Sequence, residues 1–353
     1  MDYRTVKEVA SSWEISPRRV SVLCSEGRIE GVEKIGNIFL IPKSAKKPID
    51  GRTNRKMNTT KAKPFVKWAG GKGQLLDIIS DNLPSNFGKE IKKYAEPFVG
   101  GGAVLFDMLQ KYQLEGVYIS DTNKWLINTY CAIRDYPNEV IFFLEQFQKE
   151  YLPASDEERK LFFYKKRDEF NEIKSVASNE VMLASLFIFL NRTCFNGLYR
   201  VNSKGNYNVP IGSYKNPQIC DNENILSCSK LLKKVEIVCG DYKNSEKFID
   251  DKTFVYFDPP YRPLSVTSSF TSYTEQDFND KNQIELCNYA KKLSELGAYV
   301  LLSNSDPKNT NESDEFFDEL YADFNIQRVF ASRMINSKSS SRGKISELLI
   351  KNY

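Results

Sequence analysis

Short apolar segments, each closed by polar residues or glycine, alternate with amphipathic stretches over residues 64–353. Four of these segments have the pattern of buried parallel strands. They are YAEPFVG at 94–100, VYISD at 117–121, FVYFDPPY at 254–261 and AYVLLSNSD at 298–306. Stretches with helical spacing, such as GAVLFDMLQKY and NQIELCNYAKKLSELG, lie between them. The alternation predicts an α/β fold with a doubly wound sheet, in which functional residues lie at the carboxyl ends of the strands.

Two parts of the chain do not follow this alternation. Residues 123–222 are helical at first and then rich in turn-forming and aromatic residues. We therefore expect a mainly helical domain inserted into an α/β domain made of 64–122 and 223–353. Residues 45–63 combine Lys and Arg with Pro, Gly, Asn and Thr, which is the composition of a linker. Its positive charge suits phosphate contacts, and a solvated tether is an equally good interpretation.

Residues 1–44 predict a small module of their own. The apolar residues of VKEVASSW fall on one face of a helix, and Ser16-Pro17 is typical of the start of a second helix that ends near Gly27. Gly36-Asn37 then favours a tight turn between two short strands. Two helices followed by a hairpin resemble the winged helix-turn-helix of excisionase-type and MerR-type DNA-binding proteins. A helical adaptor that does not contact DNA is the alternative interpretation.

The composition excludes several classes of function. The chain has no His, which rules out Ser-His-Asp and Cys-His catalysis and removes the commonest metal ligand. Its seven Cys form no C-x-x-C pair, a pattern that argues against zinc and fits a reducing compartment. The longest apolar run, at 181–190, is too short to span a bilayer, and the N-terminus is too charged for a signal peptide. We therefore expect a cytoplasmic protein that binds neither a metal ion nor a membrane. The net charge of +4 does not by itself indicate a nucleic-acid partner.

Two glycine-rich segments carry the first candidate site. FVKWAGGKG spans 65–73, and EPFVGGG at 96–102 follows a predicted strand and precedes a predicted helix. Glycines at such a turn let the backbone approach a ligand, and the helix N-terminus favours an anionic group. Asp121 ends the next strand, about 20 residues on, where an acidic residue binds ribose hydroxyls in the Rossmann arrangement. Because the sequence has no Walker lysine motif, a nucleoside without a triphosphate suits this site better.

The second candidate site is Asp258-Pro259-Pro260-Tyr261, directly after an apolar strand. The two prolines fix the backbone and lack N–H groups, so carbonyls there can point rigidly at a ligand. A carboxylate and a nearby carbonyl form an acceptor pair that suits an exocyclic amino group. Such a pair draws the weakly nucleophilic N6 of adenine toward tetrahedral geometry and stabilises the charge that develops during methyl transfer. Tyr261 can stack on a base. The alternative for an isolated D-P-P-Y is a rigid turn.

The order of these motifs resembles the Dam-like family of DNA adenine-N6 methyltransferases over residues 64–353. In that family the glycine motifs precede a target-recognition region, which precedes DPPY, and the sheet is Rossmann-like. The resemblance implies that S-adenosylmethionine is the cofactor, bound by Trp68, Lys72, Phe98, Gly100, Gly102, Asp121, Asp241 and Asp258. It also implies that four residues catalyse methyl transfer to an adenine flipped out of duplex DNA, namely Asp258, Pro259, Pro260 and Tyr261.

The segment FNGLYRVNSKGNYNVPIGSYKNP at 195–217 resembles the recognition hairpin of family members that methylate adenine within GATC. The resemblance implies DNA contacts from Asn196, Leu198, Arg200, Pro210, Ser213 and Tyr214. Arg200 suits bidentate contacts to guanine. Because GATC members often carry arginine where this chain has Ser213, the expected target is GATC or a related short site. Core packing with solvated charge is the alternative for this segment. Near the C-terminus, the expected phosphate contacts are Arg333, Ser337, Lys338 and Arg342.

The sequence leaves two other functions open. Related enzymes with an N/D-P-P-Y motif methylate glutamine side chains or RNA bases, although the hairpin and the N-terminal module favour duplex DNA. A DNA-binding regulator with a vestigial catalytic part is opposed by the intact DPPY, the intact glycine loops and Asp121. We expect a monomer that binds S-adenosylmethionine and double-stranded DNA. Action alone and action beside a partner restriction endonuclease both remain compatible with the sequence.

Overall fold

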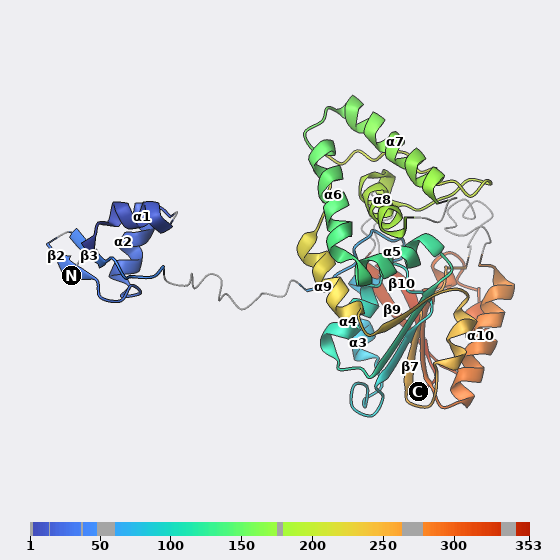
Figure 1. Cartoon of the computed structure of the whole chain (residues 1–353). Coiled ribbons are helices and arrows are strands. Elements are labelled where there is room, and N and C mark those ends of the chain that lie inside the picture. The colour runs from blue at the N-terminus through green and yellow to red at the C-terminus, as the bar shows by residue number, and fades with distance from the viewer. Residues whose placement is uncertain are drawn as a thin grey trace. The chain divides into compact units, whose positions relative to one another are not determined.

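The computed structural model describes residues 3–13, 15–36, 38–47, 61–174, 179–262, 278–332 and 344–353. The chain forms two compact units, Met1–Thr59 and Thr60–Tyr353 (Figure 1). Each unit buries its own cluster of apolar residues, so each is described by itself.

The first unit contains two helices and a three-stranded antiparallel sheet of order β1-β3-β2. Its elements are β1 (Tyr3–Arg4), α1 (Val6–Trp13), α2 (Pro17–Ser25), β2 (Glu33–Ile35) and β3 (Ile38–Pro42). Val9, Val20 and Ile41 are fully buried among them. The amphipathic spacing of α1 and the proline that opens α2 account for both helices. The sequence did not predict strand β1.

The second unit is built around a seven-stranded sheet of order β6-β5-β4-β7-β8-β10-β9. The strands are β4 (Lys93–Glu96), β5 (Gly116–Asp121), β6 (Val235–Cys239), β7 (Thr253–Phe257), β8 (Tyr299–Ser305), β9 (Asn325–Ser332) and β10 (Lys344–Lys351). The first five strands in this order are parallel, and β10 lies antiparallel between β8 and β9. The expected α/β fold with a doubly wound, Rossmann-like sheet is confirmed. The four predicted strands form its contiguous centre.

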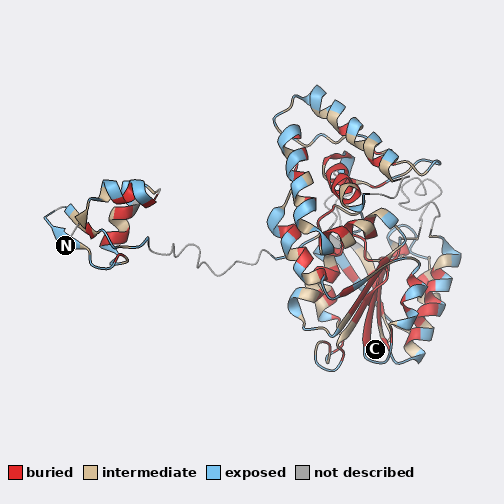
Figure 2. Cartoon of the chain, in the orientation of Figure 1, coloured by how far each residue is buried: buried red, intermediate tan, exposed pale blue. Residues whose placement is uncertain are grey.

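Helices cover both faces of this sheet. Every residue of β7 is buried; Phe254 and Tyr256 point to one face, and Val255 and Phe257 point to the other. This arrangement explains why the strand is a continuous apolar run. One face packs against α3 (Leu76–Asp81), α4 (Ala103–Lys111), α5 (Lys124–Asp135) and α9 (Asn222–Leu232). The other face packs against α10 (Asp280–Glu295) and α11 (Phe316–Leu320). Figure 2 shows that the central strands of the sheet are buried.

The connection from β5 to β6 carries the remaining long helices, which follow α5 in the chain. They are α6 (Pro137–Tyr151), α7 (Asp156–Ile173) and α8 (Glu180–Thr193). Helix α8 contains the longest apolar run of the sequence and is buried on nearly every side. Its apolar residues join those beneath the sheet in one cluster. The helices that we expected as an inserted domain therefore share one core with the sheet, within a single compact unit.

The strand order places the reversal of chain direction between β4 and β7. From β4 the chain proceeds outward to β5 and β6, and then returns to β7 on the opposite side of β4 before it continues to β8. In open α/β sheets, ligands bind at the carboxyl ends of the strands beside such a reversal. Short 3-10 helices lie at Lys72–Gln74, Phe195–Gly197, Tyr242–Lys247 and Pro307–Asn309.

Candidate active site

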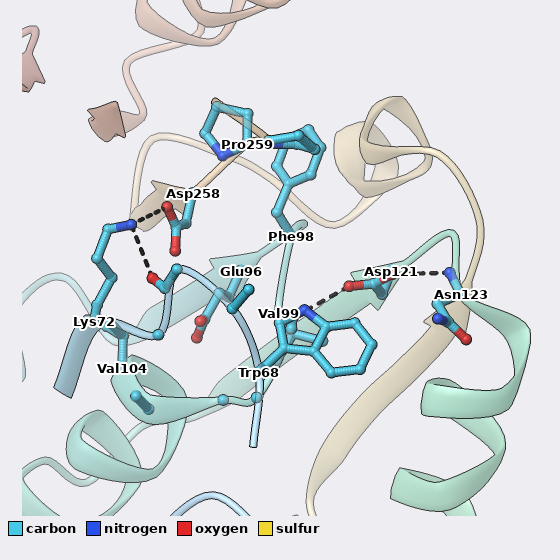
Figure 3. Close-up of a pocket in the computed structure, with 18 of the residues that line it drawn as sticks. Trp68, Lys72, Glu96, Phe98, Val99, Val104, Asp121, Asn123, Asp258 and Pro259 are labelled. Carbon is cyan, nitrogen blue, oxygen red and sulfur yellow. Dashed lines mark hydrogen bonds and ion pairs between the residues drawn. The ribbon is translucent and has the colours of Figure 1, made fainter. Parts of the chain in front are cut away.

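A pocket with a volume of ≈ 1520 Å³ opens at the carboxyl ends of β4, β5 and β7. Every residue that the sequence predicted for cofactor binding or catalysis lines it, namely Trp68, Lys72, Phe98, Gly100, Gly102, Asp121, Asp241, Asp258, Pro259, Pro260 and Tyr261. Figure 3 labels six of them: Trp68, Lys72, Phe98, Asp121, Asp258 and Pro259. These residues meet because parallel strands bring the segments that follow them to one edge of the sheet.

The glycine loop between β4 and α4 is held close to Trp68. Gly100 and Gly102 have φ values of 47° and 72°, in the left-handed region that glycine tolerates without strain. A Cβ atom on Gly100 would lie only 2.7 Å from Cδ1 of Trp68, and one on Gly102 would collide with the hydroxyl of Tyr130. Both the backbone conformation and the available space therefore require glycine at these two positions.

Asp121 joins the glycine loop to the start of α5. Its Oδ2 accepts a hydrogen bond from the Gly100 amide at 3.2 Å, and its Oδ1 accepts one from the Asn123 amide at 2.8 Å. Burial raises the pKa of the Asp121 carboxyl, and these two amides lower it. Asn123 in turn caps α5 by accepting from the amides of Trp125 and Leu126. The carboxyl group is thus fixed beside the glycine loop at the end of β5.

Aromatic rings form apolar walls around the pocket. Phe98 stacks on Tyr242, with ring centroids 5.3 Å apart, and Trp68 stacks on Tyr199 at 6.2 Å. Asp241 is exposed and accepts a hydrogen bond from the amide of Lys243 at 2.9 Å. Stacked rings beside hydrogen-bonding carboxylates suit a planar ligand that carries hydroxyl or amino groups.

Two residues donate hydrogen bonds to one oxygen of the Asp258 carboxylate. Oδ1 accepts from Nζ of Lys72 at 2.6 Å and from Oγ of Ser303 at 3.1 Å. The hydroxyl groups of Ser303 and Tyr256 are 2.8 Å apart. Because Ser303 gives its proton to the carboxylate, Tyr256 donates to Ser303. Within the described ranges no hydrogen bond is made to Oδ2, so this oxygen is available to a ligand.

Opposing influences set the ionisation of this pair. Burial raises the pKa of the Asp258 carboxyl, whereas the charge of Lys72 and the hydrogen bonds from Lys72 and Ser303 lower it. Desolvation lowers the pKa of Lys72, but attraction to Asp258, Tyr256, Tyr261 and Glu347 outweighs it and raises that pKa well above its ordinary value. At a separation of 2.6 Å, the ammonium–carboxylate form is the state that these contacts favour.

The rest of the DPPY segment is anchored from several sides. The side-chain amide of Gln283 donates to the carbonyl of Pro260 at 3.2 Å. The Tyr261 hydroxyl accepts from Lys72 at 3.0 Å and donates to Glu347 at 3.1 Å. Arg262, the next residue, forms ion pairs with Asp280 and Asp314, each at 2.7 Å. The segment therefore presents a backbone held in place by helix α10 and strand β10.

Sequence reasoning missed several residues of this site. Glu96, inside the quoted EPFVGGG, lines the pocket at 2% exposure and accepts a hydrogen bond from the Tyr94 hydroxyl at 2.7 Å. Burial raises its pKa to about 8. A carboxyl group within an apolar strand was the signal that could have identified it. Ser303 lies near the end of the predicted strand at 298–306, but its contact with Asp258 depends on the pairing of β7 with β8.

The segment predicted to recognise DNA folds back on itself without regular strands. Antiparallel bridges join Val201 to Tyr207 and Cys194 to Ile211. None of the six predicted DNA-contact residues lines the pocket. Four of the six are exposed, namely Asn196, Arg200, Pro210 and Ser213, and two are half-buried, namely Leu198 and Tyr214. Residues that contact DNA bases must be accessible to solvent in the free protein, as these six are at least in part. Their roles in DNA contact remain predictions.

This segment packs against the residue that precedes Trp68. Nζ of Lys67 lies 3.6 Å from the ring centroid of Tyr214, and a Cβ atom on Gly197 would come within 2.5 Å of the Lys67 side chain. Asn196 has a φ of 53°, the one positive value among the described non-glycine residues. Its neighbour Phe195, which was not among the predicted DNA contacts, is 51% exposed. An exposed aromatic ring beside a strained backbone marks a further candidate for DNA contact.

Some expectations fall on residues outside the described ranges, among them the phosphate contacts at Arg333, Ser337, Lys338 and Arg342 and most of the 45–63 linker. In the part of the chain that is described, no group of three or more Cys, Asp and Glu residues is arranged to hold a metal ion. Across the same ranges, the helices are all too short or too polar to cross a membrane.

Comparison with known proteins identifies the family. The model of the D12 class N6 adenine-specific DNA methyltransferases matches residues 68–335. Type II methyltransferase M.MjaIII of Methanocaldococcus jannaschii is 52% identical over 293 residues, which cover 82% of this chain and 99% of that protein. Type II methyltransferase M1.LlaDCHI of Lactococcus lactis subsp. cremoris is 40% identical, with 84% and 97% covered. The DNA adenine methylase of Escherichia coli K12 is 32% identical, with 82% and 95% covered. The chain therefore belongs to the D12 class N6 adenine-specific DNA methyltransferase family, and its enzymatic activity is the methylation of adenine N6 in DNA.

Proposed function

We propose that the enzyme takes its methyl group from S-adenosylmethionine and methylates an adenine flipped out of double-stranded DNA, within GATC or a related short site. One observation carries this proposal: the Asp258 carboxylate, the glycine loop and Asp121 line the same pocket. The hydrogen-bond acceptor for an amino group, Asp258, and the residues that suit a nucleoside, the glycine loop and Asp121, therefore border one binding space.

The residues of the pocket fit S-adenosylmethionine, which supplies an electrophilic methyl group when it is bound. Gly100 and Gly102 leave no room for a side chain, so the backbone amides of this loop can approach the amino-acid part of the cofactor. Asp121 suits the ribose hydroxyls. The positive sulfonium group is favoured by the carboxylates that line the pocket, which are Asp107, Asp121, Asp241, Asp258 and Glu285.

Trp68, Phe98 and Asp241 complete the proposed cofactor site. The two aromatic rings provide the apolar walls that the adenine and methionine parts require, and Asp241 offers a carboxylate to the exocyclic amino group of the cofactor. Lys72 also borders this space, where its main task is to hold Asp258.

The chemistry of the DPPY segment follows from its free acceptors. Oδ2 of Asp258 and the carbonyl of Pro259 accept hydrogen bonds from N6 of the target adenine, which directs the nitrogen lone pair toward the methyl group. The Pro260 carbonyl is bonded to Gln283 instead. The methylated N6 then releases one proton to Asp258 or to water, since the chain contains no His. The ring of Tyr261 stacks on the flipped base.

A flipped base leaves a gap in the duplex. We propose that a side chain from the segment at 195–217 fills this gap. Phe195 exposes an aromatic ring at the surface, and apolar side chains that insert between base steps stabilise distorted DNA. Contacts to DNA bases or to the DNA backbone are assigned to Asn196, Leu198, Arg200, Pro210, Ser213 and Tyr214. Sequencing the methylated adenines in DNA from cells that express this chain will identify the site and the effect of Ser213.

The catalytic assignment is tested with Asp258→Ala and Asp258→Asn. Both variants lose the carboxylate acceptor, so methyl transfer to a duplex should fall by more than about 100-fold, while DNA affinity changes little. The matched control is Asp251→Asn, an exposed carboxylate before β7 at the opposite edge of the sheet. Turnover by Asp258→Ala at the wild-type rate would refute the mechanism.

The cofactor assignment needs a measurement that does not depend on turnover. Asp121→Ala should weaken the binding of S-adenosylmethionine in calorimetry by about 10-fold or more, because the ribose loses a charged hydrogen-bond acceptor. Wild-type chain that does not bind S-adenosylmethionine would exclude this cofactor.

The similarity to two type II methyltransferases supports a role in restriction-modification. Expression of the chain should then protect DNA against an endonuclease that cuts at the methylated sequence. DNA that stays fully sensitive, although its adenines are methylated at that site, would exclude the protective role.

A further inference from the structure

Positive charge is distributed unevenly along the chain. Residues 1–63 hold 14 Lys and Arg against 7 Asp and Glu, a net charge of +7. Residues 64–353 hold 36 Lys and Arg against 39 Asp and Glu, a net charge of −3. Sequence-independent affinity for DNA comes mainly from neutralised phosphates. The unit that carries the active site has no excess of positive charge with which to neutralise phosphates. The residues before it hold all of the excess positive charge.

The first compact unit is also separate from the methyltransferase machinery. It lies before residue 68, where the match to the family model begins. M.MjaIII aligns over 99% of its length with only 82% of this chain, so it has no counterpart of most of this unit. Methyl transfer in such relatives does not require it. The unit has a core of its own, which includes Val9, Val20 and Ile41.

Two acidic side chains of the unit are engaged in internal hydrogen bonds, whereas two of its basic side chains are exposed. Glu8 accepts hydrogen bonds from the backbone and side chain of Thr5, and Glu33 accepts from the Tyr3 hydroxyl at 2.6 Å. Lys7 and Arg18, by contrast, are exposed, and neither forms an ion pair with a described residue. Arg18 lies in the first turn of α2, a nine-residue helix whose Val20 and Leu23 face the core. The helix thus exposes its basic end to solvent.

The hairpin of β2 and β3 carries a second unusual feature. Ile35 and Ile38 pair across its tip, and they are 63% and 62% exposed. Lys34 precedes them, and its ammonium group lies 5.5 Å from the ring centroid of Phe39. Two large apolar side chains at the tip of the hairpin are therefore mostly exposed, whereas Ile41 of the same hairpin lies in the core. Beside a lysine, they fit a groove of DNA, where apolar side chains contact sugars and base steps between phosphate contacts.

We propose that the unit Met1–Thr59 is a second DNA-binding site, whose partner is duplex DNA bound mainly through its phosphates. Helix α2 presents Arg18 to the major groove, as the second helix of a helix-turn-helix does, and the β2–β3 hairpin reaches the neighbouring groove. The unit holds the enzyme on DNA around its target and takes no part in methyl transfer. This binding is independent of the residues assigned to the active site.

The test is a salt titration of DNA affinity with the full-length chain and a duplex that lacks the target site. The variant Arg18→Glu with Lys34→Glu is compared with Lys89→Glu with Lys252→Glu. The control pair is exposed at the amino ends of the parallel strands, opposite the active site. The first variant should weaken binding by about 10-fold or more at low salt and reduce the slope of log K against log salt by about 2. The control should change the affinity less than about 2-fold.

Two further variants separate the parts of the proposal. Ile35→Ser with Ile38→Ser should weaken binding a few-fold while the salt slope stays unchanged, because apolar contacts release no counterions. Deletion of residues 1–60 should lower both affinity and slope, with kcat on saturating DNA unchanged. The proposal is overturned if the deleted chain binds DNA with the wild-type affinity and slope, or if the two charge-reversal variants behave alike. Thermal melting of each variant shows whether it has folded.

Discussion

The ammonium group of Lys72 lies 2.6 Å from Oδ1 of Asp258, across 186 residues of sequence. The Lys72 side chain is 3% exposed and the Asp258 side chain 20%. In this largely buried environment an isolated charge is unfavourable, and each charge offsets the desolvation cost of the other. The catalytic carboxylate is therefore kept ionised and oriented by the glycine-rich segment before any substrate arrives.

Loss of this cation should shift the pH dependence of catalysis. In Lys72→Met, burial acts on Asp258 without the opposing charge, so the pKa of its carboxyl rises. Asp258 acts as an ionised acceptor, so activity is present above this pKa and is lost as the pH falls through it. We expect the acid limb of single-turnover rates to move to higher pH, and the rate near pH 7 to fall about 10-fold or more. Lys72→Arg keeps the charge and should retain the wild-type limb; an unshifted limb in Lys72→Met would contradict this role.

Ser303 should contribute measurably to the rate of methyl transfer, although less than Lys72 does. Ser303→Ala removes one hydrogen bond to Asp258 and leaves the buried Tyr256 hydroxyl without its acceptor. A hydrogen bond to a charged group is worth roughly 1.5–3 kcal/mol, so we expect kcat to fall roughly 10- to 100-fold at saturating substrates. Tyr256→Phe keeps the bond between Ser303 and Asp258 and should cost only a few-fold. Equal losses in both variants would mean that the effect is packing rather than orientation of the carboxylate.

Glu96 should make stability depend on pH. Its pKa is about 8 in the folded protein, above its ordinary value of 4.5. The folded state thus retains a proton that the unfolded state releases, so the stabilisation is complete below about pH 4.5 and is lost as the pH rises through about 8. The free energy of unfolding should decrease by on the order of 5 kcal/mol across this window. Glu96→Gln, which mimics the protonated form, should flatten urea midpoints between about pH 5 and about pH 8.5. The control is Glu236→Gln, which changes an exposed carboxylate. If the urea midpoint of Glu96→Gln depended on pH as steeply as that of the wild type, Glu96 would be excluded as the cause.

Arg200 and Lys204 should differ in what they contribute to DNA binding. Nε of Arg200 donates to Asn208 at 2.8 Å, which orients the guanidinium so that its other nitrogens can read a guanine. Arg200→Ala should cost about 1–3 kcal/mol on the target site and relax discrimination at one base pair. Lys204 is exposed in the adjoining turn, so Lys204→Ala should weaken all duplexes alike and reduce the salt slope by about 1. Competition with single-base variants of the target duplex distinguishes the two residues. If Arg200→Ala weakened binding to all duplexes alike, Arg200 would not be a residue that reads a base.

The central sheet could be predicted from the sequence because strands buried on both faces are continuous apolar runs, as β7 is. The strands toward the edges were missed for the same reason. β6 is only partly buried, and β9 mixes polar and apolar residues in NIQRVFAS without a continuous apolar run. The family and its methylation of adenine were predicted correctly from the motifs and their order. The proposed roles of single residues, and the DNA-binding module at the N-terminus, remain predictions.

The sequence by itself determined which groups stand at the ends of the strands: glycines where no side chain fits, prolines that stiffen a turn, and Asp121 and Asp258 as acceptors. These are local properties, because backbone freedom and side-chain chemistry belong to each residue and its immediate neighbours. Only the tertiary structure decided the partners. Lys72, Ser303 and Glu347 reach the DPPY segment from other strands and loops. Hydrogen bonds and buried charges act over a few ångströms, so their strength depends on sheet order and packing, which no short motif contains.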